Sequence, residues 1–272
     1  MPKMIDFSRF VDPGHPVTNV AHQDVKTCLL SSNAAEIIQT VMEGYNRIPV
    51  TDDKTHYHGM IKAIDVLDFL GGGAKYSKFL SGRMNTKAEH IMETSAEAVT
   101  PKHTTAKVLD GMKKRNLDSC PLLVGKKFSG LVSEASFVHR VRGRTGIQVR
   151  DAMVHKPMIA KEHMSVADVA SIMVRTRYRR LPVASKGVLL GIVTPYDIIS
   201  HLKSKNALHD LKAQTLPVTQ VMNANVVTVS PEDDLAVAID KMRSGYSCLP
   251  VVEENELMGI ITERDVLELL QL

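Results

Sequence analysis

Two short segments of the sequence combine a threonine and an aspartate at a spacing that suits binding of a sugar phosphate. Thr194 and Thr262 each precede an apolar helical stretch, and Asp197 and Asp265 follow three residues later. A threonine at a helix start caps a helix whose first amides and dipole favour a phosphate. A carboxylate one turn into the helix accepts two hydrogen bonds from a ribose diol, as in dinucleotide sites. These two corners are candidate nucleotide sites.

The same spacing also has a purely structural interpretation. Thr-x-x-Asp is close to a capping box, which only stabilises a helix start. The wider Gly-h-h-Thr context, where h is an apolar residue, and the neighbouring basic residues 175–180 favour a binding site in the second half of the chain.

The corners belong to an internal repeat that occurs four times. Each copy has a hydrophobic-Pro step and a glycine nine or ten residues later, at Pro49 and Gly59, Pro121 and Gly130, Pro182 and Gly191, and Pro250 and Gly259. An amphipathic helical pattern precedes each proline, and a polar turn between the proline and the glycine indicates a hairpin. Each copy is therefore predicted to be strand, helix, strand, strand, helix. Such a unit is too small to bury both faces of its sheet, so the copies should pair.

The repeat predicts the division of the chain. An N-terminal segment at 1–18 precedes copies at 19–71, 88–141, 149–203 and 216–272, which gives two halves at 1–142 and 147–272. The glycines at 71–73 are predicted to form a linker and not a phosphate loop, because no Gly-Lys-Ser/Thr ending follows them.

The repeat itself resembles a known family. Leu-Pro-Val at 181–183, followed by Gly-Ile-Val-Thr-Pro-Tyr-Asp at 191–197, is similar to the cystathionine-β-synthase (CBS) domain. A chain of four copies with no attached enzyme resembles the γ subunit of AMP-activated protein kinase and its prokaryotic relatives. The resemblance implies an α/β (α+β) fold of four βαββα domains, paired into two Bateman modules in a disc-like assembly. It also implies AMP, ADP or ATP as ligands in clefts between copies.

The resemblance further implies which residues bind. In the family, the aspartate of one copy binds the ribose and the partner copy supplies the adenine slot. One implied cleft contains Asp265, Thr262, Glu263 and Arg264 together with Met153, Met158, Tyr178, Arg179 and Arg180. The other contains Asp197, Thr194, Pro195 and Tyr196 together with Val226, Ser247 and Cys248.

The first half departs from this pattern. The first copy keeps Asp65 but has Lys62 where a threonine would be, so Asp65, Lys62 and Arg47 form a weaker candidate site. Its partner loop carries Asp118, which would repel a phosphate. The second copy has Ser136 in place of the aspartate, so a ribose would lose its charged acceptor and this cleft is expected to be empty.

Four arginines lie just before the third copy's Leu-Pro step. Arg175 and Arg177 are expected to form the solvated face of a helix end. Arg179 and Arg180 directly precede Leu-Pro, where the family places phosphate ligands, and the guanidinium fork suits phosphate oxygens.

Composition narrows the remaining classes. The chain has 272 residues, a formal net charge of +4, 44% hydrophobic residues and 4% aromatic residues with no tryptophan. This balance is typical of a globular protein and disfavours a stacking platform for unpaired bases. Three distant cysteines are expected to be core residues in a reducing compartment, and scattered histidines predict no metal site. No apolar stretch reaches the length of a membrane span, so a cytoplasmic protein is expected.

These observations lead to one hypothesis and two alternatives. The hypothesis is a non-catalytic regulator that senses AMP, ADP and ATP and modulates an unidentified protein partner; a second copy of the chain, in a homodimer, is a further candidate partner. One alternative is a nucleic-acid-binding regulator that uses the basic segment 140–150. The other is binding of S-adenosylmethionine, whose sulfonium would not favour Arg179 and Arg180. An enzyme is disfavoured because the four repeats use nearly every residue.

Overall fold

The computed structural model describes residues 3–75 and 83–272. They form two compact units, each assembled from separate stretches of chain. Of the described residues, unit 1 comprises 3–25, 97–157 and 226–272, and unit 2 comprises 26–75, 83–96 and 158–225. Unit 1 thus contains the second and fourth copies and unit 2 the first and third, whereas the repeat order alone predicts halves of consecutive copies. Each unit has its own cluster of buried apolar side chains.

Unit 2 confirms the predicted βαββα order in both of its copies. In each copy the first strand pairs in parallel with the second, which pairs antiparallel with the third. The first copy contains β2 (Cys28–Leu29), α1 (Ala34–Met42), β3 (Arg47–Thr51), β4 (Tyr57–Lys62) and α2 (Ala63–Leu67), which continues as η3 (Asp68–Gly72). The third copy contains β7 (Ala160–Lys161), α6 (Val166–Thr176), β8 (Leu181–Ser185), β9 (Val188–Val193) and α7 (Pro195–Ser204).

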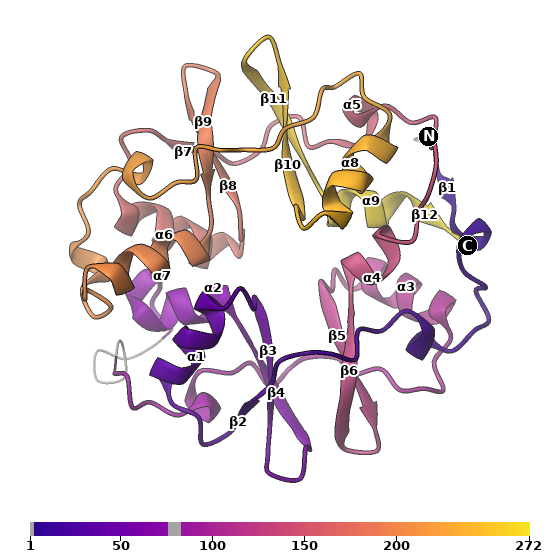
Figure 1. The fold of residues 1–272 in the computed structure, drawn as a ribbon, viewed down its shortest axis with the longest axis horizontal. Coiled ribbons are helices and arrows are strands. Elements are labelled where there is room, and N and C mark those ends of the chain that lie inside the picture. The colour runs from indigo at the N-terminus through magenta and orange to yellow at the C-terminus, as the bar shows by residue number, and fades with distance from the viewer. Residues whose placement is uncertain (1–2, 76–82) are drawn as a thin grey trace. The chain divides into compact units, whose positions relative to one another are not determined.

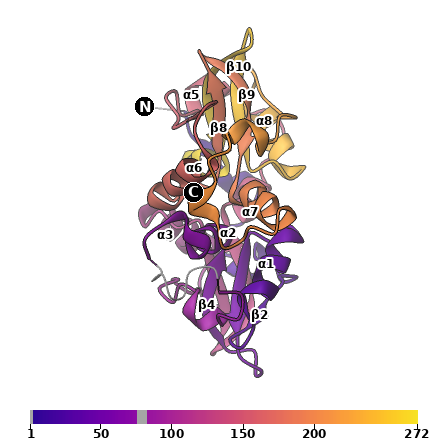
Figure 2. The ribbon, with the colours of Figure 1, turned by 90° about the vertical axis from the view of Figure 1, so that its left-hand side faces the viewer.

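The helices of unit 2 pack between its two hairpins. In Figures 1 and 2, α1, α2, α6 and α7 lie between hairpin β3–β4 and hairpin β8–β9. Their apolar stripes supply the core: Val41 of α1, Val66 of α2 and Met173 of α6 are fully buried. Burial of each such side chain contributes about 1.5–3 kcal/mol to the free energy of unfolding. The apolar stripe of each helix therefore determines which face it packs against the other helices.

Unit 1 repeats this arrangement with shorter first strands. In the second and fourth copies the first strand is a single parallel bridge, Val99 with Leu122 and Val229 with Val251. The second copy contains α3 (Thr105–Lys114), β5 (Ser119–Val124), β6 (Lys127–Ser133) and α4 (Glu134–Val138). The fourth copy contains α8 (Leu235–Arg243), β10 (Cys248–Glu253), β11 (Glu256–Thr262) and α9 (Glu263–Leu269), and α5 (Val149–Ala152) also belongs to unit 1.

The two ends of the described chain meet in unit 1. Strand β1 (Ile5–Asp6) pairs in parallel with β12 (Leu270–Gln271), in the register Ile5 to Leu270. Phe7 follows β1 and is fully buried, with its ring 6.1 Å from that of Phe137. Ile5, Phe7 and Val17 of the N-terminal segment predicted at 1–18 therefore belong to this core. Among the described helices, none is both long and apolar enough to span a bilayer.

The glycine of each repeat lies where another segment crosses its hairpin. A Cβ added to Gly191 would lie 2.7 Å from the carbonyl oxygen of Asn223 and 2.7 Å from Sδ of Met222. Since real Cβ atoms do not approach a backbone oxygen so closely, only glycine allows the two backbones to pair here. The four crossings form the bridges Met60 to Glu93, Leu131 to His22, Ile192 to Asn223 and Ile260 to Val154.

Replacing this glycine should therefore destabilise the protein. Gly191→Ala is expected to lower the free energy of unfolding by about 1–3 kcal/mol, because the added methyl group meets a hydrogen-bonded backbone that cannot rotate away. Urea denaturation of the full chain measures the effect. Gly14→Ala is the matched control, since its Cβ would meet nothing closer than Asp12 Oδ1 at 3.4 Å. Equal stability of Gly191→Ala and the wild type would contradict the crossing.

Candidate functional site

The Thr194–Asp197 corner joins β9 to α7 in unit 2. Thr194 is the N-cap, and its side chain accepts a hydrogen bond from the backbone N–H of Asp197. In return Asp197 Oδ2 accepts hydrogen bonds from the backbone N–H of Thr194 at 2.8 Å and from its hydroxyl at 2.6 Å. This is a reciprocal capping box, as the structural interpretation of the motif predicts.

The Thr262–Asp265 corner joins β11 to α9 in unit 1 and has the same geometry. Asp265 Oδ2 accepts hydrogen bonds from the Thr262 backbone N–H at 2.8 Å and from the hydroxyl at 2.7 Å. Two corners in separate units thus hold a carboxylate by one of its two oxygens.

The other oxygen of each carboxylate remains available. Oδ1 of Asp197 and of Asp265 accepts no hydrogen bond from any other described residue, and neither atom is sealed from solvent. Burial raises the pKa of both carboxyls, while hydrogen bonds from Thr194 and Thr262 oppose that rise. A half-buried carboxylate with one open oxygen is suited to accept hydrogen bonds from a bound molecule, which would also stabilise its charged form.

The helix starts offer fewer amides to a phosphate than the sequence suggests. In α7, Pro195 has no N–H and the Asp197 N–H is bonded to Thr194, so only the Tyr196 amide remains in the first turn. In α9, the Glu263 N–H donates to the carbonyl of Ser247. Charged side chains must therefore provide most of the binding of any phosphate.

The two units separate the other predicted residues into two groups. Unit 1 contains Met153, Val226, Ser247 and Cys248, and Met153 lies against Gly259 on the strand that leads to Asp265. Unit 2 contains Met158, Tyr178, Arg179 and Arg180, with Met158 and Tyr178 exposed.

Glu263 and Arg264 have partners within unit 1 that sequence reasoning did not foresee. Glu263 is buried, and its Oε1 lies 2.9 Å from Nε2 of His139. Arg264 donates to the carbonyl oxygens of Met112, Lys113 and Leu117 at the end of α3, and also pairs with Glu268. These contacts join the fourth copy to the second, so neither residue is retained as a nucleotide ligand.

The corner of the first copy is occupied by a side chain of the protein. Asp65 is 1% exposed; its Oδ2 accepts the Lys62 N–H at 2.8 Å, and its Oδ1 accepts a hydrogen bond from Arg177 Nη2 at 2.7 Å. The expectation that Arg177 belongs to a solvated helix face is incomplete: its side chain is 46% exposed, but a buried carboxylate from another copy holds its guanidinium. The corner of the second copy ends in Ser136, whose Oγ accepts the Ser133 N–H.

The basic segment 140–150 is largely used inside unit 1. Arg140 donates to the carbonyl oxygens of Asn19 and Ser136, and Arg142 donates to that of Val141. Arg150 pairs with Glu232, while Arg144 is exposed. A guanidinium that holds a carbonyl or carboxylate of its own chain is less available to a nucleic-acid phosphate.

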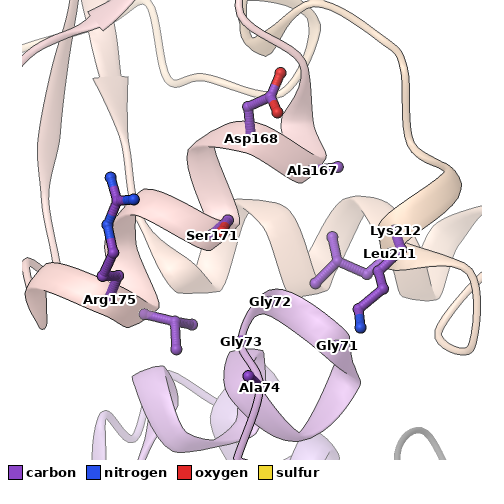
Figure 3. Close-up of a pocket in the computed structure, with 11 residues that line it drawn as sticks. Gly71, Gly72, Gly73, Ala74, Ala167, Asp168, Ser171, Arg175, Leu211 and Lys212 are labelled. Carbon is purple, nitrogen blue, oxygen red and sulfur yellow. The ribbon is translucent and has the colours of Figure 1, made fainter. Parts of the chain in front are cut away.

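A hollow of about 540 Å³ lies in unit 2, away from the corners (Figure 3). It is lined by Gly71–Ala74, by the side of α6 that carries Ser171 and by η5 (Leu211–Ala213). Arg175 and Asp168 point away from the glycines. No residue predicted to bind a nucleotide lines it. Within the ranges 3–75 and 83–272, no group of three His, Cys, Asp or Glu side chains is arranged to hold a metal ion.

Comparison with known proteins identifies the class. The model of the CBS-domain family matches residues 17–72, 149–204 and 218–272. The chain belongs to the CBS-domain family. The second copy lies outside the matched segments, although its helix, hairpin and second helix follow the same order as those of the other copies.

The chain is also similar to particular proteins. It is 26% identical to protein MJ1225 of Methanocaldococcus jannaschii, over 91% of this chain and 95% of that protein. The crystal structure of MJ1225, described as a candidate archaeal homologue of γ-AMPK, matches with a TM-score of 0.83 over 93% of this chain and 99% of that chain. The chain therefore resembles the γ subunit of AMP-activated protein kinase, as the sequence predicts.

Two further relatives differ in how fully they match. A 33.4 kDa protein in a ribosomal RNA operon of Thermofilum pendens is 26% identical over 87% of this chain and 85% of that protein. The homoserine O-acetyltransferase of Methanohalobium evestigatum is 24% identical over 80% of this chain but only 44% of the enzyme. The second match leaves more than half of the enzyme without a counterpart.

The raised pKa of Asp197 makes a prediction about stability and pH. The folded state binds the proton of this carboxyl more tightly than the unfolded state does. The free energy of unfolding therefore falls as pH rises above 3.8, the ordinary pKa of an aspartate. Asp197→Asn removes this dependence, so the stability of the variant relative to wild type should rise as pH increases from about 4 towards neutrality. Urea denaturation at a series of pH values measures it. Asp168→Asn, at the same helix position in α6, is the control. A pH-independent difference for Asp197→Asn would contradict the prediction.

Proposed function

We propose that this chain is a non-catalytic regulatory protein that binds AMP, ADP or ATP at the Asp197 and Asp265 corners. The observation that carries the proposal is the matched geometry of these two corners, where the cap holds Oδ2 and leaves Oδ1 open. The similarity to MJ1225 over nearly the full length of both chains supports it.

The proposed roles follow from the chemistry of each group. The open carboxylate oxygen of Asp197 or Asp265 accepts hydrogen bonds from the ribose diol, and the threonine holds the carboxylate in place. The guanidinium groups of Arg179 and Arg180 bind phosphate oxygens. Within unit 1 we propose Met153 as a contact of the base or sugar held by Asp265, and within unit 2 we propose Pro195 and Tyr196 as contacts of the one held by Asp197. For Met158, Tyr178, Val226, Ser247 and Cys248, the sequence prediction stands untested.

The alternatives have less support. S-adenosylmethionine offers the same diol but carries a sulfonium, which Arg179 and Arg180 would repel. A nucleic-acid regulator would need the segment 140–150, most of whose guanidinium groups hold other groups of unit 1. The partial match to homoserine O-acetyltransferase provides no basis for a catalytic role of this chain.

A regulator acts by binding its ligand more tightly in one state than in another. We propose that AMP, ADP and ATP compete, and that the number of phosphates changes the affinity for a protein partner. Coupling of about 1–3 kcal/mol is the usual range for such effects.

Removing the ribose acceptors should remove binding. The binding of AMP, ADP, ATP and S-adenosylmethionine can be compared by calorimetric titration. We expect the wild type to bind all three nucleotides. S-adenosylmethionine is expected to bind more weakly than the nucleotides or not at all. Asp197→Ala and Asp265→Ala should each lose one equivalent of nucleotide, because the diol loses its charged acceptor. Arg179→Ala should weaken the binding of ATP more than the binding of adenosine, since the substitution removes only contacts to phosphate.

The matched control for these titrations is Asp168→Ala. Asp168 is the third residue of α6 and is hydrogen-bonded to the N-cap Ser165, as Asp197 is to Thr194. It lies in the first helix of its copy, however, and not at the corner that joins the last strand to the second helix. This variant should bind like the wild type. Unchanged stoichiometry in both Asp197→Ala and Asp265→Ala would refute the proposed sites.

A further inference from the structure

In all three aspartate corners, Oδ2 of the aspartate accepts the backbone N–H of the residue three places earlier. The corners differ in what meets the second carboxylate oxygen. Oδ1 of Asp197 and of Asp265 receives no hydrogen bond from another described residue, whereas Oδ1 of Asp65 receives Arg177 Nη2 at 2.7 Å. Asp65 is 1% exposed, while the other two aspartates are half-buried. The atom that would take a ribose hydroxyl in the first copy is thus already bonded to the third copy.

The backbone position of Arg177 is unusual for an arginine. In each copy, the residue five places before the repeat proline has a positive φ angle, where the chain leaves its first helix. That residue is Gly44 (φ 97°), Asn116 (φ 53°), Arg177 (φ 61°) and Gly245 (φ 105°) in the four copies. Glycine and asparagine tolerate this left-handed conformation, but a long side chain there is strained. In the third copy, the side chain at this position reaches an aspartate of the first copy.

The pairing of copies explains why only one corner is covered. In unit 2, the helix end of the third copy faces the corner of the first copy, and Arg177 covers Asp65. The equivalent residue in the first copy is Gly44, which has no side chain to cover Asp197. The two corners of this unit therefore differ in Arg177 and in the capping residue, which is Lys62 at Asp65 and Thr194 at Asp197.

The electrostatic surroundings favour a cation at this place. Asp68, one turn after Asp65, is also buried, and burial raises the pKa of its carboxyl, while Lys75 and Arg177 act in the opposite direction. Two buried carboxyls one turn apart repel each other, so a cation between the copies stabilises both. An uncharged ribose diol could replace the hydrogen bond of Arg177 but not its charge.

We propose that Arg177 is a built-in occupant of the Asp65 corner, which excludes a nucleotide ribose and restricts binding to the corners of Asp197 and Asp265. This proposal rests on the proposed function, because it assigns the corners which that function uses. In this proposal Arg177 determines how many nucleotides the chain binds. Asp65 then serves as a contact between copies and not as a ligand-binding residue.

The test is a calorimetric titration of the full chain with adenosine and, separately, with AMP. Adenosine has the diol without a phosphate, so it reports on the carboxylate alone. Arg177→Gly removes the guanidinium and gives the third copy the residue that the first and fourth copies have at this position. The variant should bind one more equivalent of adenosine than the wild type, and Arg177→Gly combined with Asp65→Asn should lose it again.

Two further variants complete the test. Asp65→Asn alone should leave the stoichiometry of both probes unchanged, because Asp65 does not bind ligand in the wild type. Arg175→Gly is the control for loss of an arginine near the end of α6 and should add no equivalent.

Two results would overturn the proposal. One is a loss of an equivalent in Asp65→Asn, which would show that the corner already binds ligand; this result decides the matter even if Arg177→Gly does not fold. The other is a folded Arg177→Gly variant, checked by circular dichroism, with no added adenosine. Absence of any binding to the wild type would refute the proposed function, whereas a site gained in Arg177→Gly would still support this inference.

Discussion

In three of the four copies, the second helix starts at a carboxylate whose two oxygens have different partners. In the corners of Asp197 and Asp265, the N-cap threonine takes Oδ2 through both its N–H and its hydroxyl. This bond fixes the turn from the last strand of the copy into its second helix. Because a cap needs only one oxygen, a residue that stabilises the helix also retains an acceptor for another molecule. The structural and the ligand-binding interpretations of the Thr-x-x-Asp motif are therefore compatible.

The four copies use this one corner in different ways. Asp65 gives its second oxygen to Arg177, and the second copy has Ser136, which caps the helix without a charge. Residues at the corners and the helix ends also join copies that are not consecutive. Arg264 binds the last carbonyls of α3 in unit 1, as Arg177 binds Asp65 in unit 2. Repetition thus supplies one scaffold, in which single residues decide whether a corner is bonded to another copy or keeps an open carboxylate oxygen.

Much of the fold could be predicted from the sequence because the repeat is periodic. Apolar spacing, the Pro step and the glycine were sufficient for the βαββα order, and the structure explains the glycine by a crossing backbone 2.7 Å from its missing Cβ. The partners that Glu263, Arg264 and Arg177 have in other copies could not be predicted in this way, since these partners lie 112 to 152 residues away along the chain. One signal was available for Arg177. It occupies a position where two other copies have glycine and one has asparagine.

The most direct test of the central claim is a crystal structure of the chain grown with AMP. The account predicts ribose hydroxyls within hydrogen-bonding distance of Oδ1 of Asp197 and of Asp265, with Oδ2 of each still bonded to its threonine and with Arg177 still on Asp65. AMP bound away from both corners, or bound only after a threonine cap has opened, would contradict the account.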